Sequence, residues 1–99
     1  MGWKIYDEPV DMMQRKYKYF PNIFRWRGQR FRVEAVERRW TVVRGGRKRR
    51  IERHFWQIQC AEGDFELFQD IRTGTWHLRR ARLATARISV LSRMVPAWR

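Results

Sequence analysis

Guanidinium and ammonium groups are the side chains of this sequence with the clearest chemistry, because they form charge-assisted hydrogen bonds with phosphate oxygens. Lys and Arg number 23 against 10 acidic residues, which gives a formal net charge of +13, and most of the cations are arginine. Repulsion among these charges disfavours the compact state, so a polyanionic partner would relieve a cost already present. The charge therefore favours nucleic acid as the partner. An arginine-rich proteome and an acidic protein neighbour are the alternatives.

The densest group of cations lies in the segment Arg44-Gly45-Gly46-Arg47-Lys48-Arg49-Arg50, which holds five cations in seven residues. The two glycines predict a mobile loop, and its charge prevents the loop from folding back onto its own surface. We expect this loop, together with Arg53, to bind backbone phosphates. A loop that only improves solubility is the alternative.

A second group of cations alternates with apolar residues from Phe24 to Val33, on both sides of Gly28-Gln29. This pattern predicts a β-hairpin with a type II′ turn at the two central residues. One face of the hairpin would carry two rungs of opposed arginines, each costing up to ~1 kcal/mol unless a polyanion binds there. Neutralisation by Glu34 and Glu37, or a solvated outer face, are the alternatives. The two predicted rungs of opposed arginines are Arg25 opposite Arg32 and Arg27 opposite Arg30.

The segment from Gln14 to Phe20 interleaves basic and aromatic residues, a texture suited to contacts with both the backbone and the bases of a nucleic acid. It equally suits a charged edge strand that discourages aggregation. Trp3 and Trp98 also lie outside the clear core pattern and are further candidates for base stacking, which favours single strands. The candidate contact residues of the segment are Lys16, Tyr17, Lys18 and Tyr19.

Catalytic chemistry has little support in the sequence. Cys60 is the only cysteine, which excludes an internal disulfide and a Cys-based zinc ribbon, and its inward strand position makes it a core residue. His54 and His77 could meet across neighbouring strands, but with Asp70 they do not match the spacing of a standard metal site. We expect no enzyme activity, no metal and no cofactor. A metal-dependent nuclease is the alternative for the acidic cluster of Glu62, Asp64, Glu66 and Asp70. Turn chemistry explains Glu62, Asp64 and Asp70 without it.

Alternation of apolar and polar residues between turn signals predicts a mainly β protein, a bent antiparallel meander of about five strands forming a small barrel-like sheet. Residues 3–13 are expected to form a lead-in and a possible edge strand. A bulge is expected between Ala35 and Val36, where the apolar parity changes. Apolar residues at helical spacing from Ala81 to Val95 predict a C-terminal amphipathic helix. The expected strands are 24–27, 30–43, 54–60, 65–70 and 75–79.

At 99 residues the chain is expected to form a single domain, 1–99, with a β core over 9–80 and a basic tail over 81–99 that is helical or partly disordered. No apolar run approaches the roughly 18 residues needed to span a bilayer, and no signal sequence opens the chain. We therefore expect no membrane partner and a cytoplasmic location, with nucleoid association if the protein binds DNA.

Several aromatic and glycine elements occur in a fixed order along the chain: Phe24-x-Trp26-Arg27-Gly28-x-x-Phe31-x-Val33, then Trp40, Phe55, Gly63-x-Phe65-Glu66-Leu67-Phe68-x-Asp70, and Gly74-x-Trp76-x-Leu78-x-Arg80. In this order the chain resembles, from Pro9 to Arg80, a family of small uncharacterised bacterial domains. Some of these are encoded beside, or fused to, relatives of Y-family translesion DNA polymerases. The resemblance implies a link to DNA repair or replication and names no catalytic residue. The basic loop from Arg44 to Arg53 and the basic tail after Arg80 depart from the family pattern.

Together these observations predict a basic nucleic-acid-binding module that contacts mainly backbone phosphates, with DNA favoured over RNA, as an accessory of repair or replication. The alternative is a protein-interaction adaptor that docks on an acidic or polymerase-like partner. Removing the cations at 47–50 should weaken binding to all DNA sequences under the first hypothesis, and should not matter for DNA under the second. Strand preference, sequence preference and oligomeric state stay open.

Overall fold

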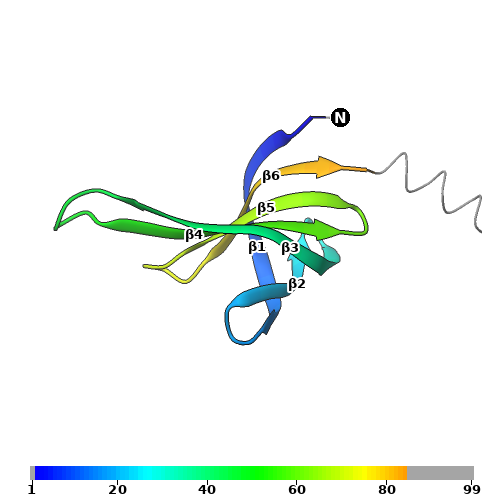
Figure 1. Cartoon of the computed structure of the whole chain (residues 1–99), viewed down its shortest axis with the longest axis horizontal. Helices are drawn as coiled ribbons and strands as arrows, with labels where there is room; N and C mark the ends of the chain where they lie inside the picture. Colours follow the sequence, from blue (N-terminus) through cyan, green and yellow to red (C-terminus); the bar gives the residue numbers. More distant parts are fainter. Residues whose placement is uncertain (1, 85–99) are drawn as a thin grey trace, which may run out of the picture.

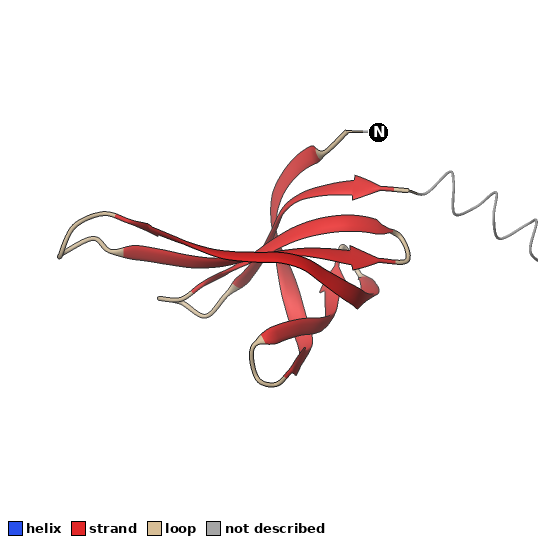
Figure 2. Ribbon diagram, viewed as in Figure 1, coloured by secondary structure: helices blue, strands red, loops and turns tan. Residues whose placement is uncertain are grey.

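The computed structural model describes residues 2–84, which form six β-strands and no helix. Figure 1 labels the strands along the chain, and Figure 2 shows the same view by secondary structure. Each strand pairs antiparallel with its neighbour in sequence, and β1 also pairs with β6, so the sheet closes into a ring. The mainly β prediction is confirmed, with six strands in place of about five. The strands are β1 (Lys4–Lys16), β2 (Phe20–Trp26), β3 (Gln29–Arg44), β4 (Ile51–Cys60), β5 (Gly63–Asp70) and β6 (Trp76–Leu83).

β1 includes most of residues 3–13, for which the sequence predicted only a lead-in and a possible edge strand. It is not an edge, because its first half pairs with β6 and its second half pairs with β2. The strand is irregular on both sides of this change of partner: the ladder with β6 is interrupted between Ile5 and Glu8, where Asp7 has a φ of 49°, and the ladder with β2 is interrupted between Met12 and Arg15. Such irregularities interrupt the two-residue alternation by which a strand is recognised. β1 therefore closes the ring without a clear signal in the sequence.

The β2–β3 hairpin forms as expected but around a different turn. The two turn residues are Arg27 and Gly28, not Gly28 and Gln29. Both have positive φ, 52° and 77°, which is the type I′ geometry rather than type II′. Phe24 therefore pairs with Phe31 instead of Val33.

The core lies inside the ring and is built from alternate residues of the strands. The rings of Phe24 and Phe31 stack at 5.2 Å between centroids, and Phe65 contacts them at 5.5 and 5.0 Å. Cys60 is buried in the core, as expected, and this burial raises the pKa of its thiol to about 12. The aliphatic residues that are completely buried are Ile58, Leu67 and Leu78.

The β3–β4 hairpin extends beyond the ring (Figure 1). β2 pairs with β3 only as far as Arg32, and β5 pairs with β4 only from Arg53 onward, so the outer end of the hairpin has no flanking strand among residues 2–84. Two register irregularities within residues 33–38 lie on either side of the position between Ala35 and Val36. The predicted break in the regular pattern of β3 is thus present, as two irregularities instead of one.

β6 continues through Leu83, past Ala81, where a helix was predicted to begin. Ala81 is only 1% exposed and belongs to the core of the sheet. The remainder of the predicted helix and Trp98 lie outside the described residues. In the described part of the chain, no helix has the length and apolar character that crossing a membrane requires.

Candidate nucleic-acid interface

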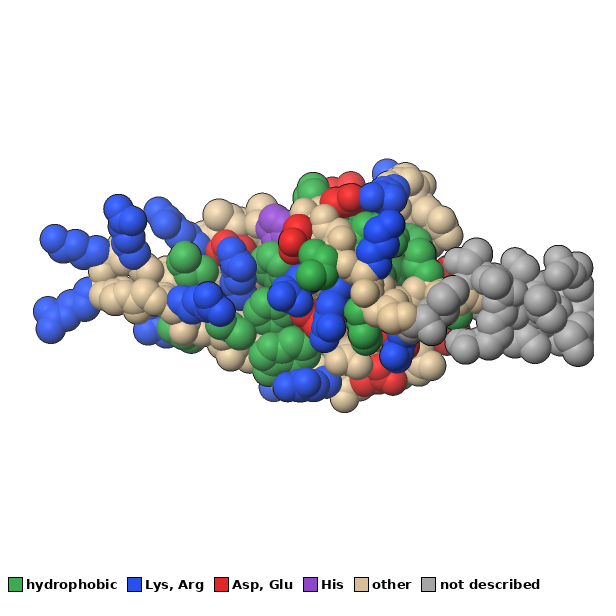
Figure 3. Space-filling model, turned by 90° about the horizontal axis from the view of Figure 1, so that it is seen from above, with side chains coloured by type: hydrophobic (Ala, Val, Ile, Leu, Met, Phe, Trp, Pro, Cys, Tyr) green, Lys and Arg blue, Asp and Glu red, His purple; other side chains and the backbone are tan. Residues whose placement is uncertain are grey.

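The outer end of the β3–β4 hairpin carries a dense group of cations, visible in Figure 3 as Lys and Arg side chains extending at the left. Gly45 turns the loop with a φ of 89°, and a Cβ at this position would overlap the carbonyl oxygen of Arg49, so the loop requires glycine there. The six cationic residues, here called the basic tip, are all exposed: Arg44, Arg47, Lys48, Arg49, Arg50 and Arg53.

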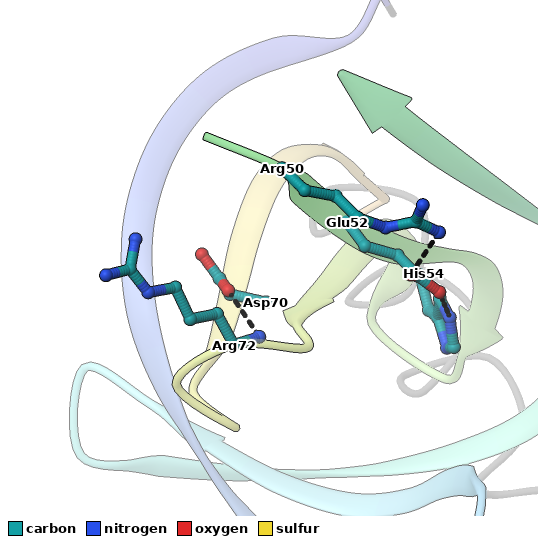
Figure 4. Close-up of polar contacts among 5 residues, drawn as sticks. All are labelled: Arg50, Glu52, His54, Asp70 and Arg72. Carbon is teal, nitrogen blue, oxygen red and sulfur yellow. Dashed lines mark hydrogen bonds and ion pairs between the residues drawn. The ribbon is translucent and has the colours of Figure 1, made fainter. Parts of the chain in front are cut away.

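One carboxylate lies beside the basic tip. Glu52 pairs with Nε2 of His54 at 3.0 Å and with Nη2 of Arg50 at 3.2 Å (Figure 4). The hydrogen bond with His54, followed by the one with Arg50, lowers the pKa of Glu52. No carboxylate of residues 2–84 lies within ion-pair distance of the other five basic-tip residues. The basic tip therefore presents more positive charge than the described protein neutralises.

The turn between β5 and β6 braces the base of this hairpin. The backbone N–H of Ile71 donates to the carbonyl oxygen of Glu52 at 3.0 Å. Asp70 Oδ1 in turn accepts the backbone N–H of Arg72 at 2.9 Å, and Figure 4 shows the Arg72 side chain pointing away from Glu52. Hydrogen bonds therefore hold the hairpin in place where it begins to project from the ring, although no strand of the described residues pairs with its outer end.

Three of the four arginines predicted on the β2–β3 hairpin share an exposed outer face. Arg25 lies opposite Arg30, whereas Arg32 lies opposite an isoleucine. The change of turn leaves one rung of opposed arginines where two were predicted. Neither Glu34 nor Glu37 forms an ion pair with these arginines in the described structure, and the Glu37 carboxylate accepts a glutamine side chain of β4 instead.

Arg27, the fourth of these arginines, is bound within the protein. Its Nε and Nη2 donate to the two carboxylate oxygens of Glu8 at 2.8 and 2.5 Å, and Nε1 of Trp26 donates to the same carboxylate at 2.8 Å. The hydrogen bond from Arg27, and then the one from Trp26, lowers the pKa of Glu8 to about 2. The guanidinium also lies over the rings of Trp26 and Tyr6, at 4.9 and 5.2 Å. Arg27 therefore ties the turn to β1 and, contrary to the prediction, is not on the charged face.

Replacing Glu8 with glutamine should make stability less dependent on pH in the acidic range. The pKa of Glu8 in the folded protein, about 2, is below its usual value of 4.5. Its carboxylate therefore contributes stability that is fully present above pH 4.5 and is lost as the pH falls through the folded pKa. We expect the free energy of unfolding in urea to be lower in Glu8→Gln at pH 7, and the difference from wild type to narrow toward pH 2.

Glu34→Gln is the matched control for this measurement, since it removes the same charge from an exposed position that has no ion pair in the described chain. Its difference from wild type should stay small across the same pH range. A difference between Glu8→Gln and wild type that is the same at pH 7 and pH 2.5 would contradict the assignment.

Residues 17–19 form the turn between β1 and β2, whereas Gln14 to Lys16 belong to the end of β1, which pairs with β2 on one side only in the described chain. Tyr17 and Lys18 have positive φ, 53° and 69°, and the N–H of Tyr19 donates to the carbonyl oxygen of Lys16 at 3.1 Å. The side chains of Tyr17 and Tyr19 are open to solvent, with 82% and 67% of each residue exposed. Both residues therefore lie outside the core, as their place in the sequence pattern indicated, and base stacking on them stays a prediction.

The structure does not bring the three predicted groups of cations to one surface. Figure 1 places the β1–β2 turn at the bottom of the view and the basic tip at the far left, with the β2–β3 turn at neither position. The basic tip holds the most cations of the three groups, and of its six residues only Arg50 is paired with a carboxylate in the described chain. It is therefore the strongest candidate for binding a polyanion.

Trp3 is less open than its position outside the core pattern indicated. It is half-buried, and the guanidinium groups of Arg80 and Arg82 lie over its ring at 4.6 and 5.0 Å. A base could stack there only by displacing these side chains, so Trp3 is a weak candidate for base contact.

The acidic residues considered for a nuclease serve separate local roles. Asp64 pairs with an arginine of β6 at 2.7 Å. Glu66 is only 2% exposed and pairs with Arg80 at 2.8 Å and with Arg79 at 3.4 Å. Asp70 accepts backbone N–H groups of the β5–β6 turn. Among residues 2–84, no three His, Cys, Asp or Glu side chains are grouped as a metal ion would require.

The two histidines also remain apart. His54 bonds to Glu52, whereas Nε2 of His77 bonds to Oγ1 of Thr75 at 2.9 Å. The ring of His77 stacks on Phe68 at 4.8 Å between centroids, with an angle of 16° between the planes. His77 is therefore part of an aromatic arrangement rather than of a metal site.

This arrangement is a feature that the sequence did not identify as a site. Alternation along β4 and β5 places Phe55 and Phe68 on the face opposite the core residues Trp56 and Leu67, and they lie at the centre of a row of aromatic rings that runs from β3 to β6. A groove of about 530 Å³ lies beside this row and is lined by aromatic, aliphatic and arginine side chains. The outward position of the two phenylalanines was the available signal, but sequence spacing does not place the arginines around them.

Comparison with known proteins gives a family but no described function. Neither among curated proteins nor among solved structures was there a significant match to this chain. A family model described as a domain of unknown function, DUF6504, matches residues 1–85, a range that includes all six strands and the basic tip. This agrees with the expectation of a small uncharacterised domain. The chain therefore belongs to the DUF6504 family.

Proposed function

We propose that this domain binds nucleic acid through the basic tip, with contacts mainly to backbone phosphates. The observation that supports this function is a hairpin that projects five exposed cations beyond the ring, with a sixth, Arg53, where β5 begins to flank it, and with Glu52 as the one carboxylate paired to them in the described chain. Guanidinium groups bind phosphate oxygens in pairs, and their affinity for a phosphate backbone does not depend on base sequence. The proposed binding is therefore tolerant of sequence.

Two further groups of exposed cations supplement the basic tip in this proposal. One is the face of Arg25, Arg30 and Arg32, and the other is formed by Lys16 and Lys18 at the turn between β1 and β2. Because these groups lie apart from the basic tip, we expect them to add electrostatic attraction at longer range, which salt screens strongly. Variants that remove the same number of charges from the basic tip or from these other groups can separate the two contributions.

The test is fluorescence anisotropy with labelled single-stranded DNA, duplex DNA and RNA over a series of salt concentrations. The tip variant carries Arg47→Ala, Lys48→Ala, Arg49→Ala and Arg50→Ala. A matched variant carries Lys16→Ala, Lys18→Ala, Arg25→Ala and Arg30→Ala, so both lose four positive charges. We expect wild-type affinity to fall with salt by about 0.7–0.9 log units per log unit of salt for each phosphate contacted. The tip variant should lose most of this dependence and the matched variant less.

Two results would contradict the proposal. The first is that wild type binds none of the three nucleic acids at near-physiological salt. The second is equal loss in both variants, which would show that net charge, rather than the position of the cations on the hairpin, determines binding. A circular dichroism spectrum and a thermal unfolding curve for each variant show whether the ring is intact.

We also propose that the biological ligand is DNA, and that the domain works beside a polymerase-like protein in repair or replication. The support for this is the resemblance, from Pro9 to Arg80, to small domains encoded beside or fused to relatives of Y-family polymerases. This support comes from the proteins that accompany the similar domains and not from the geometry of the site. Comparison of the DNA and RNA titrations tests the preference between the two ligands.

The second candidate function is that of an adaptor that docks on an acidic protein, and one observation favours it. β3 from Val33 to Arg44 pairs only with β4 among the described residues, so its other edge offers unpaired backbone groups to an added strand. For an adaptor of this kind the ligand is the partner protein, and removing the tip cations would not matter for DNA. The nucleic-acid titrations therefore distinguish the two functions.

A further inference from the structure

Four rings on neighbouring strands form a continuous ladder on the outer face of the sheet. Trp40 of β3 stacks on Phe55 of β4 at 5.2 Å with an angle of 9°, and Phe55 contacts Phe68 of β5 at 5.2 Å. Phe68 stacks on His77 of β6 at 4.8 Å. The register pairs each of these residues with the next, so the ladder is built into the strand pairing. Cross-strand packing accounts for Phe55 and Phe68, which are each only 8% exposed.

Trp40 differs from the two phenylalanines because it ends the ladder. At this position β3 has β4 on one side and no strand of residues 2–84 on the other. The guanidinium of Arg38 lies over the indole, 4.5 Å from the ring centre, and Arg38 is exposed and has no ion pair in the described structure. A ligand can therefore displace Arg38 from the ring without breaking a salt bridge.

The groove beside the ladder combines this aromatic end with positive charge. Trp40 and Phe55 contribute to its wall, and its volume of about 530 Å³ is in the range of small-ligand sites. Its only carboxylate, Glu66, is already paired with two of the lining arginines and is almost fully buried. The groove is thus cationic toward a ligand. Its four arginines are Arg44, Arg53, Arg79 and Arg80.

We propose that this groove binds single-stranded nucleic acid, with one unpaired base stacked on Trp40 and the adjoining phosphates on the groove arginines. This inference rests on the proposed function and deepens it, because it names the form of nucleic acid. An aromatic ring binds the face of a base, and in a duplex that face is covered by the neighbouring base pairs. The Arg38 guanidinium leaves the indole when the base arrives and pairs with a flanking phosphate. Arg44 and Arg53 belong to both the groove and the basic tip, so one strand can follow the hairpin from the groove to the loop.

The experiment compares three ligands of equal length and label: an ordinary single strand, the same strand with abasic sites at its centre, and a duplex. The abasic strand keeps every phosphate and lacks only the stacking bases. We expect wild type to bind the ordinary strand about tenfold more tightly than the abasic one, the scale of stacking one base on an aromatic ring. Trp40→Leu should bind both strands with the affinity that wild type has for the abasic strand. Its affinity for duplex should stay within about twofold of wild type, since the phosphate contacts are unchanged.

Tyr6→Leu is the matched control, because the Tyr6 ring is also covered by cationic groups, those of Lys4 and Arg27, and none of these three residues lines the groove. It should keep the preference for the ordinary strand. Retained duplex binding shows that Trp40→Leu is folded. If that variant does not fold, the wild-type affinities for the ordinary and the abasic strand still test the inference by themselves.

Equal wild-type affinity for the ordinary and abasic strands would overturn this inference, as would tighter binding of duplex than of single strand. If salt-dependent binding to the basic tip persists in that case, the proposed function stands without the base site. Absence of binding to all three ligands instead overturns the proposed function, and the base site with it.

Discussion

Replacing Phe65 with alanine is expected to lower the free energy of unfolding by about 3–5 kcal/mol, the usual loss for a fully buried phenylalanine. Phe65 is completely buried, and its ring lies 5.0 Å from that of Phe31, 5.5 Å from Phe24 and 6.2 Å from Trp26. Truncation removes the ring that joins β5 to the β2–β3 hairpin and leaves a cavity among three other aromatic residues. Unfolding in guanidinium chloride, followed by tryptophan fluorescence and circular dichroism, measures the loss.

Tyr17→Ala is the control for this experiment, because Tyr17 is 82% exposed and its loss should change stability by less than about 0.5 kcal/mol. A loss of less than about 1 kcal/mol in Phe65→Ala would show that the site collapses around the missing ring. In that case the aromatic cluster would not be what holds the ring of strands closed.

The reason to expect so large a contribution lies in the way the ring closes. β2 and β3 pair only over residues 23–26 and 29–32, a short ladder compared with the one that joins β3 to β4. Few backbone hydrogen bonds therefore attach β2 to β3, and the packing of Phe24 and Phe31 on Phe65 contributes a larger share. The long β3–β4 ladder, in contrast, stabilises a hairpin that can project beyond the ring and carry the basic tip.

The sequence predicted the faces of the β2–β3 hairpin correctly but not its register. Facing Phe24 with Phe31 instead of Val33 shifts one strand by two residues, which leaves every side chain on the same face except that of Arg27, which enters the turn. The hydrophobic pattern therefore fits both registers equally well. The observed turn places Arg27 in a left-handed conformation, where it reaches Glu8, and this partner is 19 residues away in the sequence. Local turn propensity contains no information about that contact.

The candidate site was also predictable only in part, because some of its features are local in the sequence and others depend on contacts between distant residues. The charge of the loop from Arg44 to Arg50 is a local property, and the structure places these residues at an exposed hairpin end, as the sequence indicated. The groove depends on strand order and register, which bring Trp40 and Phe55 beside Arg79 and Arg80. Sequence spacing alone showed the aromatic residues and the arginines separately and could not place them together.

Replacing Gly63 with alanine is expected to destabilise the protein by at least about 2 kcal/mol, since a non-glycine residue in so unusual a conformation costs on the order of 1–3 kcal/mol by itself. Gly63 begins β5 with a φ of 145° and pairs with Leu83 of β6. A Cβ there would overlap the carbonyl oxygen of Arg82 and lie 2.8 Å from the Cα of Leu83. Both neighbours are backbone atoms, so the end of β6 must move away from β5, and thermal and denaturant unfolding will show the loss.

Gly74→Ala separates the two causes of this loss. Gly74 also has a positive φ, 75°, but no atom outside its own chain neighbours lies within 4 Å of a Cβ at that position. It should therefore lose only the conformational part, about 1–2 kcal/mol. A larger loss of unfolding free energy in Gly63→Ala than in Gly74→Ala gives the energetic cost of the Cβ overlap between β5 and β6. These two strands bring Glu66, Arg79 and Arg80 into the groove. Equal losses would show that the end of β6 adjusts freely, and that the strand pairing at Gly63 does not hold the groove arginines in place.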